Sequence, residues 1–149
     1  MHHRKGNNFS APLGNVFILT NISQIGDKTA SSSTALVKML SPLCIREHNR
    51  GENKDSYYSV ANESFEKKAN KIIQEQLINS GFDNKMVKCF SIQPINSKKT
   101  VVFHYGNYIE CSLGEFVLNG DKAIINYLLQ SGIGSRKSAG FGLPILVAE

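Results

Sequence analysis

Short apolar segments alternate with polar ones along this chain, and their spacing predicts both strands and helices. An apolar segment at 34–40 predicts a strand. A Ser-Pro pair at 41–42 interrupts this strand, because proline cannot donate to a sheet ladder. Residues 43–46 are expected to continue the strand beyond a bulge. The charged segment 47–59 carries charges of mixed sign, and we interpret it as a solvated loop.

Two later segments have the periodicity of amphipathic helices. The first can be capped by Asn62 and closed by Gly81, and the second spans 122–131, between Asp121 as its cap and Gly132 at its end. Each segment places its apolar residues on one helical face. These faces are Phe65, Ala69, Ile72, Ile73 and Leu77 in the first helix, and Ile124, Ile125, Leu128 and Leu129 in the second.

The remaining apolar segments predict strands. Two of them, 86–94 and 100–112, are expected to pair as a hairpin joined by 95–99, and a short strand at 143–147 ends the pattern. From residue 34 onward the predicted order is therefore β-α-β-β-α-β. This order predicts an α+β fold of the ferredoxin-like type, an antiparallel four-stranded sheet with two helices on one face. An extra β-favouring run at 15–22 precedes this unit.

Composition narrows the class of protein. The chain has 149 residues, of which 41% are hydrophobic, and its longest apolar runs are far shorter than a membrane span. Disorder and a membrane-spanning role are therefore not expected. The formal net charge is +5 with a pI near 9.2, which permits a polyanionic partner without requiring one.

The cysteines and the N-terminus predict a cytoplasmic location. Cys44, Cys89 and Cys111 form no CxxC pair, so a zinc knuckle is excluded, and we interpret all three as buried structural thiols in a reducing compartment. The basic start of the chain is followed by polar residues instead of the apolar stretch of a secretory signal.

The segment 132–142 is the most informative one, because it holds four of the 12 glycines. It lacks the third glycine of a dinucleotide fingerprint and follows a helix instead of opening one, and no Gly-Lys-Ser/Thr triplet exists. A nucleotide cofactor is therefore not expected. Arg136 can fork onto a phosphate, Lys137 adds a charge, and Phe141 could stack on an unpaired base. The alternative is a helix cap at Gly132 followed by an ordinary turn with Phe141 in the core, and composition leaves both interpretations open.

The run GIGSRKSAGFGLPILV resembles the C-terminal signature of the CRISPR-associated endoribonucleases of the Cas-six family, in the RAMP superfamily. In that family a glycine-rich loop of the form G-[IL]-G-x-[RK]-x-x-x-G-[FM]-G precedes the final strand. Three further segments resemble the family: LSPLCIR at 40–46, GEFVLNG at 114–120 and Leu13-Gly14-Asn15.

The resemblance implies two ferredoxin-like halves in tandem. Residues 34–149 would then form the second, RNA-binding half with its glycine-rich loop. Residues 1–33, with the strand at 15–22, would be a remnant of the first half.

The resemblance also implies a chemistry, which is the processing of precursor CRISPR RNA in antiviral defence. The 2′-hydroxyl attacks the adjacent phosphate and leaves a 2′,3′-cyclic phosphate, without metal or cofactor. The histidine and the Tyr or Lys that assist usually lie in the first half, so no catalytic residue is assigned here. His2 and His3 lie at the terminus, while His48 could contact RNA but fits a solvated loop. His104, in a predicted strand, is interpreted as structural.

RNA contact is expected at the glycine-rich loop and at the predicted hairpin. Lys85, Lys88, Lys98 and Lys99 cluster there, although lysines also commonly serve to block edge pairing. The predicted RNA-binding residues are Gly132, Gly134, Ser135, Arg136, Lys137, Ser138, Gly140, Phe141, Gly142, Lys98 and Lys99.

Three functions remain open at this stage. The first is a repeat-RNA endoribonuclease, which would act with a separately encoded N-terminal half, as a homodimer or in a CRISPR surveillance complex. The second is a catalytically inactive module or fragment that only binds repeat RNA. The third is a ferredoxin-like regulatory domain for a small metabolite, which leaves the glycines around Arg136 and Lys137 unexplained. None of the three involves a membrane.

Overall fold

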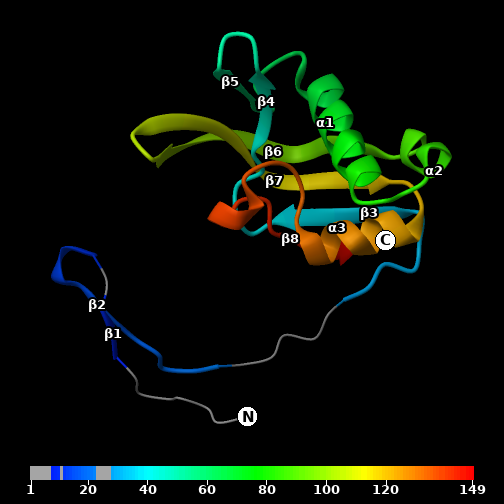
Figure 1. The fold of residues 1–149 in the computed structure, drawn as a ribbon. Helices are drawn as coiled ribbons and strands as arrows, with labels where there is room; N and C mark the ends of the chain where they lie inside the picture. The colour runs from blue at the N-terminus through cyan, green and yellow to red at the C-terminus, as the bar shows by residue number, and fades with distance from the viewer. Residues whose placement is uncertain (1–7, 11, 23–27) are drawn as a thin grey trace.

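A computed structural model describes residues 8–10, 12–22 and 28–149 of the chain (Figure 1). The sequence of elements agrees with an α+β domain in which an N-terminal strand pair precedes the main sheet. The elements are β1 (Asn8–Ser10), η1 (Pro12–Gly14), β2 (Val16–Ile18), β3 (Thr34–Met39), β4 (Ile45–Asn49), β5 (Lys54–Tyr58), α1 (Phe65–Asn79), α2 (Asn84–Lys88), β6 (Ser91–His104), β7 (Asn107–Asn119), α3 (Lys122–Ser131), η2 (Lys137–Ala139) and β8 (Pro144–Ala148).

The main sheet has four antiparallel strands in the order β6-β7-β3-β8. With α1 and α3 as the crossovers, this is the ferredoxin-like βαββαβ fold that the sequence predicts. The buried residues of both helices join one core with those of β3 and β7, so both helices cover the same face (Figure 1). Phe65 of α1, for example, lies 6.3 Å from Phe116 of β7 between ring centroids.

Both predicted long helices are confirmed, and their caps differ in detail. In α3 the Asp121 side chain accepts a hydrogen bond from the backbone N–H of Ala123 at 2.7 Å, as an N-cap should. In α1 the capping position is Ser64, and Asn62 instead accepts from the N–H of Ser59 at 2.7 Å. Asn62 therefore shapes the turn before the helix and does not cap its first turn.

The segment 47–59, predicted as a loop, is instead the β4–β5 hairpin. Its strands carry mostly polar residues, so no apolar alternation marks them in the sequence. The turn is set by Asn49, whose side-chain oxygen accepts from the N–H of Gly51 at 3.0 Å, and by Asn53, which adopts a positive φ of 48°.

The predicted hairpin 86–112 is correct in kind and wrong in its boundaries. Residues 84–88 form α2, because Asp83 caps them through hydrogen bonds from the N–H groups of Lys85 and Met86. The turn lies at Tyr105 and Gly106, both with positive φ, and not at 95–99.

The run at 15–22 contains a shorter strand, β2, which pairs with β1 in a separate two-stranded sheet. Its three residues, Val16, Phe17 and Ile18, are all exposed. His2, His3 and part of the segment 23–33 lie outside the described residues. In the part of the chain that is described, no helix is long and apolar enough to cross a membrane.

Candidate nucleic-acid interface

The glycine-rich loop, residues 132–142, connects α3 to β8 and is held by backbone hydrogen bonds. Gly132 ends α3 by donating its N–H to the carbonyl of Leu128 at 3.0 Å. The N–H of Ile133 donates to the carbonyl of Gly142 at 2.8 Å, which closes the loop across its base. The N–H of Gly142 in turn donates to the carbonyl of Pro42 at 2.9 Å. The loop is thus tied to the segment between β3 and β4.

Two of the loop glycines are required by close backbone approach. A Cβ on Gly142 would overlap the carbonyl oxygen of Ile133, and a Cβ on Gly134 would lie 2.6 Å from the carbonyl oxygen of Cys44. Both residues also have positive φ, 76° and 83°. Gly140 shares a positive φ but has open space around it. Gly134 and Gly142 are therefore required for the conformation of the loop and are buried within it.

Ser135 docks the loop onto the start of β4. Its N–H donates to the carbonyl of Cys44 at 2.7 Å, and its hydroxyl accepts from the N–H of Arg46 at 3.3 Å. On the other side, the amide of Gln76 in α1 donates to the carbonyl of Gly134 at 2.7 Å. These contacts fix the backbone next to Arg136.

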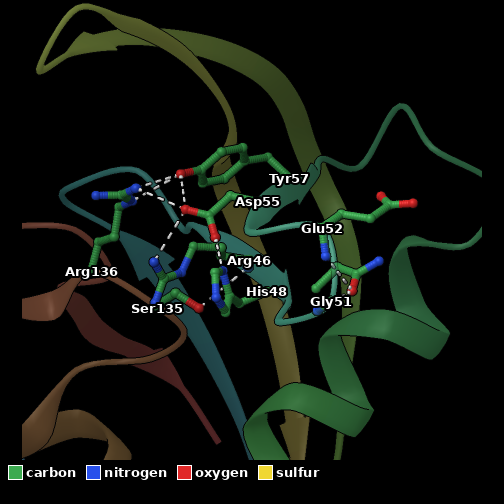
Figure 2. Close-up of polar contacts among 9 residues, drawn as sticks. Arg46, His48, Gly51, Glu52, Asp55, Tyr57, Ser135 and Arg136 are labelled. Atoms are coloured by element: carbon green, nitrogen blue, oxygen red, sulfur yellow. Dashed lines mark hydrogen bonds and ion pairs between the residues drawn. The ribbon is translucent and has the colours of Figure 1, made fainter.

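Arg136 adopts a left-handed conformation, with φ 57°, and its guanidinium turns toward the β4–β5 hairpin (Figure 2). It donates from Nε to the hydroxyl of Tyr57 at 3.2 Å, with a second bond from its terminal nitrogen to the same oxygen. The terminal nitrogen also lies 3.4 Å from the carboxylate of Asp55. The glycine-rich loop and the hairpin therefore form one polar cluster.

Asp55 is the shared acceptor of this cluster (Figure 2). Its carboxylate accepts from Arg46 at 3.2 Å, from the Tyr57 hydroxyl at 3.2 Å and from Nδ1 of His48 at 2.8 Å. Because a carboxylate only accepts, Nδ1 of His48 must carry a proton. Two guanidinium groups and an imidazole thus surround a single carboxylate, which leaves the cluster with a net positive charge.

The neighbours shift the proton affinities of three groups in the cluster. The hydrogen bond from His48, aided by Arg46, lowers the pKa of Asp55 despite its partial burial. Burial raises the pKa of Tyr57, against the opposing effect of Arg136. The hydrogen bond to Tyr57 raises the pKa of Arg136. Near neutral pH the cluster therefore contains an ionised Asp55, a neutral Tyr57 and a charged Arg136.

Phe141 lies in a small second core and is 7% exposed. It packs with Cys44, Ile109 and Cys111, and its ring meets that of His104 edge-on at 5.6 Å. The expectation that Phe141 stacks on a base is therefore wrong for this conformation, and the alternative of a core residue holds. The reason is that Cys44, Ile109 and Cys111 offer an apolar site beneath the loop, in which burial of the ring is favourable.

The other predicted loop residues differ in their surroundings. Ser138 and Gly140 are exposed, whereas Gly132 is buried. Lys137 is partly buried, because its methylene groups lie against Gly132, where an added Cβ would be 3.2 Å from its Cδ.

Lys98 and Lys99 lie within β6 and not in a hairpin loop, opposite Leu113 and Ser112 of β7. Lys99 forms an ion pair with Glu110 at 2.6 Å. Lys85 and Lys88 lie apart from them in α2. The lysine cluster expected from the sequence is therefore divided between two elements, because residues 84–88 form a helix instead of the start of the strand.

The tip of the β6–β7 hairpin carries an aromatic group that the sequence analysis missed. Phe103, Tyr105 and Tyr108 are strongly exposed, and the rings of Phe103 and Tyr108 lie 5.1 Å apart. The ring of Tyr105 contacts that of His104 at 4.4 Å, and His104 contacts Phe141. The available signal was Gly106 between two β-favouring runs, since glycine suits the positive φ of a two-residue hairpin turn.

No group of three or more His, Cys, Asp or Glu side chains is placed to hold a metal ion within residues 8–10, 12–22 and 28–149.

A βαββαβ domain with a glycine-rich loop before its last strand is the arrangement that the sequence motifs imply for a RAMP-type protein. The family model for CRISPR associated protein Cas6, C-terminal, matches residues 25–144. The chain belongs to this family. A search of curated protein sequences gives no match.

Solved structures share the fold. The product of a Cas6-related gene from Pyrococcus furiosus superposes with a TM-score of 0.76 at 22% identity, over 95% of this chain and 58% of that one. A RAMP protein binding different RNA substrates gives 0.74 at 24% identity, over 95% and 59%. A CRISPR associated protein Cas6 gives 0.65 at 20% identity, over 89% and 55%. This chain thus spans less than three fifths of the length of each.

Proposed function

We propose that this chain binds CRISPR repeat RNA through its glycine-rich loop and serves the processing of precursor CRISPR RNA. The observation that carries the proposal is the position of Arg136, on a loop whose backbone is fixed at Ser135 and Gly142. A fixed backbone reduces the conformational entropy that binding would otherwise cost.

The charge balance of the cluster favours a phosphate ligand. Arg136 and Arg46 share Asp55 as their carboxylate partner, and the Arg136 contact is the longer one, at 3.4 Å. A phosphate oxygen could replace Asp55 as the acceptor for Arg136 and form a stronger, bidentate contact. Tyr57 would keep the guanidinium oriented during this exchange.

The aromatic hairpin tip supplies the second element of an RNA surface. Exposed rings such as those of Tyr105 and Tyr108 offer stacking platforms for unpaired bases. His104 and Phe141 link the tip to the underside of the glycine-rich loop. A single strand could therefore contact guanidinium groups and aromatic rings on neighbouring elements.

The proposed reaction is a metal-independent cleavage in antiviral defence. The 2′-hydroxyl of the RNA attacks the adjacent phosphorus, the bond to the 5′ oxygen breaks, and the products are a 2′,3′-cyclic phosphate and a 5′-hydroxyl. In this proposal the present chain orients the phosphate backbone, and the groups that move protons come from the first ferredoxin-like half.

We further propose that residues 1–33 belong to that first half and that it completes the active protein. The exposed apolar side chains of Val16, Phe17 and Ile18 in β2 support this, because such a strand suits a larger sheet. A separately encoded half, a second copy or a surveillance complex in the cytoplasm could supply the other strands of that half. Light scattering of the purified chain, alone and with each candidate, would distinguish them.

The alternative is a module that binds repeat RNA without cutting it. One structural relative is described as a RAMP protein binding different RNA substrates, which favours binding as the shared property. The two candidates differ in the fate of the RNA and not in the surface that holds it.

One experiment tests both candidates. Labelled repeat RNA is incubated with the chain in EDTA, and the products are examined for a cyclic-phosphate end. Cleavage supports the enzyme, and binding without cleavage supports the module. A chain that binds repeat RNA no better than an unrelated RNA of equal length would overturn the proposal.

The site assignment is tested by a charge-matched pair of variants. Arg136→Ala with Lys137→Ala should weaken binding and reduce the magnitude of the slope of log affinity against log salt by about 1.4, since each lost phosphate contact on a single strand accounts for about 0.7 through counterion release. Lys85→Ala with Lys88→Ala removes the same charge from α2, which lies at the other end of the sheet (Figure 1). Equal losses in both variants would show a diffuse electrostatic attraction instead of a site.

A further inference from the structure

Two cysteines lie side by side beneath the glycine-rich loop. Cys44 precedes β4, Cys111 lies in β7, and both side chains are fully buried in the small core that contains Phe141. Each of these cysteines is the largest influence on the pKa of the other, as expected of neighbouring thiols in one small core. The third cysteine, Cys89, is exposed at the end of α2, so the expectation that all three cysteines are buried is wrong for this one.

The backbone register places these two cysteines directly opposite each other. Leu43 and Ser112 form an antiparallel bridge and exchange both of their N–H···O bonds, at 2.8 and 3.0 Å. The next pair along, Cys44 and Cys111, is therefore a non-hydrogen-bonded pair, in which the Cα atoms are about 4.5 Å apart. This separation lies within the range that disulfides adopt, about 4.4–6.8 Å.

The surroundings favour reaction at Cys44. The neighbouring thiol of Cys111, together with the charge of Arg136, lowers the pKa of Cys44 despite its burial. The neighbouring thiol of Cys44 and burial raise the pKa of Cys111. Cys44 is thus the better nucleophile, and Cys111 is positioned as the resolving thiol.

We propose that Cys44 and Cys111 are a peroxide-sensitive pair that forms a reversible disulfide beneath the glycine-rich loop. The Cys44 thiolate attacks hydrogen peroxide, which breaks the O–O bond, gives a sulfenic acid and, after protonation, releases one water. The Cys111 sulfur then attacks the Cys44 sulfur, the S–O bond breaks, and a second water leaves with the Cys111 proton. The two thiols lose two electrons in total, and the peroxide gains them.

The disulfide would stiffen the support of the loop. Cys44 accepts the 2.7 Å hydrogen bond from the N–H of Ser135, so a crosslink from Cys44 to β7 fixes the strand on which the loop rests. This inference is independent of RNA binding, because both thiols lie beneath the glycine-rich loop and form no part of the surface proposed to hold RNA.

The test uses the full chain with Cys89→Ser, which removes the exposed thiol and leaves the core unchanged. After graded hydrogen peroxide, a non-reducing digest is examined by mass spectrometry. We expect a linked Cys44–Cys111 peptide, no free thiol at either position, and full reversal by dithiothreitol. The oxidised form should melt at least about 5 °C higher, because the crosslink closes a long loop of the unfolded chain.

A Cys111→Ser variant provides the control. It should form no crosslink, and Cys44 should instead accumulate as sulfenic or higher acids. The inference fails if the Cys89→Ser protein retains both thiols under peroxide that oxidises Cys89 in the wild type. It also fails if Cys44 and Cys111 gain oxygen without becoming linked. Both of these outcomes are measured on protein that keeps Cys44 and Cys111. Neither therefore depends on whether the Cys111→Ser variant folds.

Discussion

The guanidinium of Arg136 donates two hydrogen bonds to the hydroxyl of Tyr57, across 79 positions of the chain. This contact joins the glycine-rich loop to the β4–β5 hairpin. The Tyr57 hydroxyl in turn donates a hydrogen bond to the carboxylate of Asp55 at 3.2 Å. Arg136, the residue proposed to contact phosphate, is therefore oriented by a hairpin that has few apolar residues. The two elements should consequently respond together to mutation.

Tyr57→Phe removes the acceptor of Arg136 and the donor to Asp55 while keeping the ring. We expect the free energy of unfolding to fall by about 1.5–3 kcal/mol, since partly buried hydrogen bonds to two charged groups, Arg136 and Asp55, are lost. Urea denaturation measures the change. Tyr108→Phe, at an exposed ring of the hairpin tip, is the matched control and should change stability by less than about 0.5 kcal/mol. Equal effects in the two variants would contradict the role given to Tyr57.

Gly142→Ala should destabilise the chain much more than Gly140→Ala. Both residues have positive φ, so each substitution carries a backbone cost of about 1–2 kcal/mol. Only at Gly142 would the new Cβ also overlap the carbonyl of Ile133, which forces the base of the loop apart. Thermal and urea unfolding of the two variants should therefore differ by at least about 2 kcal/mol. Similar stabilities would mean that the loop closes differently.

Phe141→Ala tests the core position of this ring. Truncation of a buried Phe costs about 3–5 kcal/mol, so the variant should be severely destabilised. Phe103→Ala, at an exposed ring, should leave the free energy of unfolding nearly unchanged and weaken RNA binding if the hairpin tip stacks bases. A stable Phe141→Ala protein with reduced RNA affinity would restore the stacking interpretation.

The sequence predicts the βαββαβ order because its long elements carry clear apolar periodicity, as in α1 and α3. It misses α2, in which Met86 and Val87 resemble the start of a strand and the capping Asp83 is the local sign of a helix. It also misses the β4–β5 hairpin, where polar residues such as Lys54 and Asp55 occupy a strand stabilised by its pairing.

For the site, the sequence indicates Arg136 but not the residues that it contacts. Glycines beside a cation are a local pattern, whereas the contacts to Tyr57 and Asp55 depend on tertiary structure. The same limit explains Phe141: its position in the motif is local, but its inward direction depends on Cys44, Ile109 and Cys111, which other parts of the chain bring beneath it. Local patterns thus located the loop and could not determine which of its side chains are exposed.

The cluster around Asp55 should make stability depend on pH in the acid range. The hydrogen bond from Nδ1 of His48 is the main cause of the lowered pKa of Asp55, so folding favours the ionised carboxylate. The resulting stabilisation is fully present above the unfolded pKa, about 3.9, and is lost as the pH falls through the lower pKa of the folded state. Asp55→Asn should therefore be less stable than the wild type at pH 7, and the difference should shrink below about pH 4. Urea denaturation from pH 7 downward measures this difference in stability.

Glu52→Gln, which replaces an exposed carboxylate in the turn of the same hairpin, is the control and should leave the pH profile of stability unchanged. A constant gap between wild type and Asp55→Asn at every pH would contradict this account of the cluster.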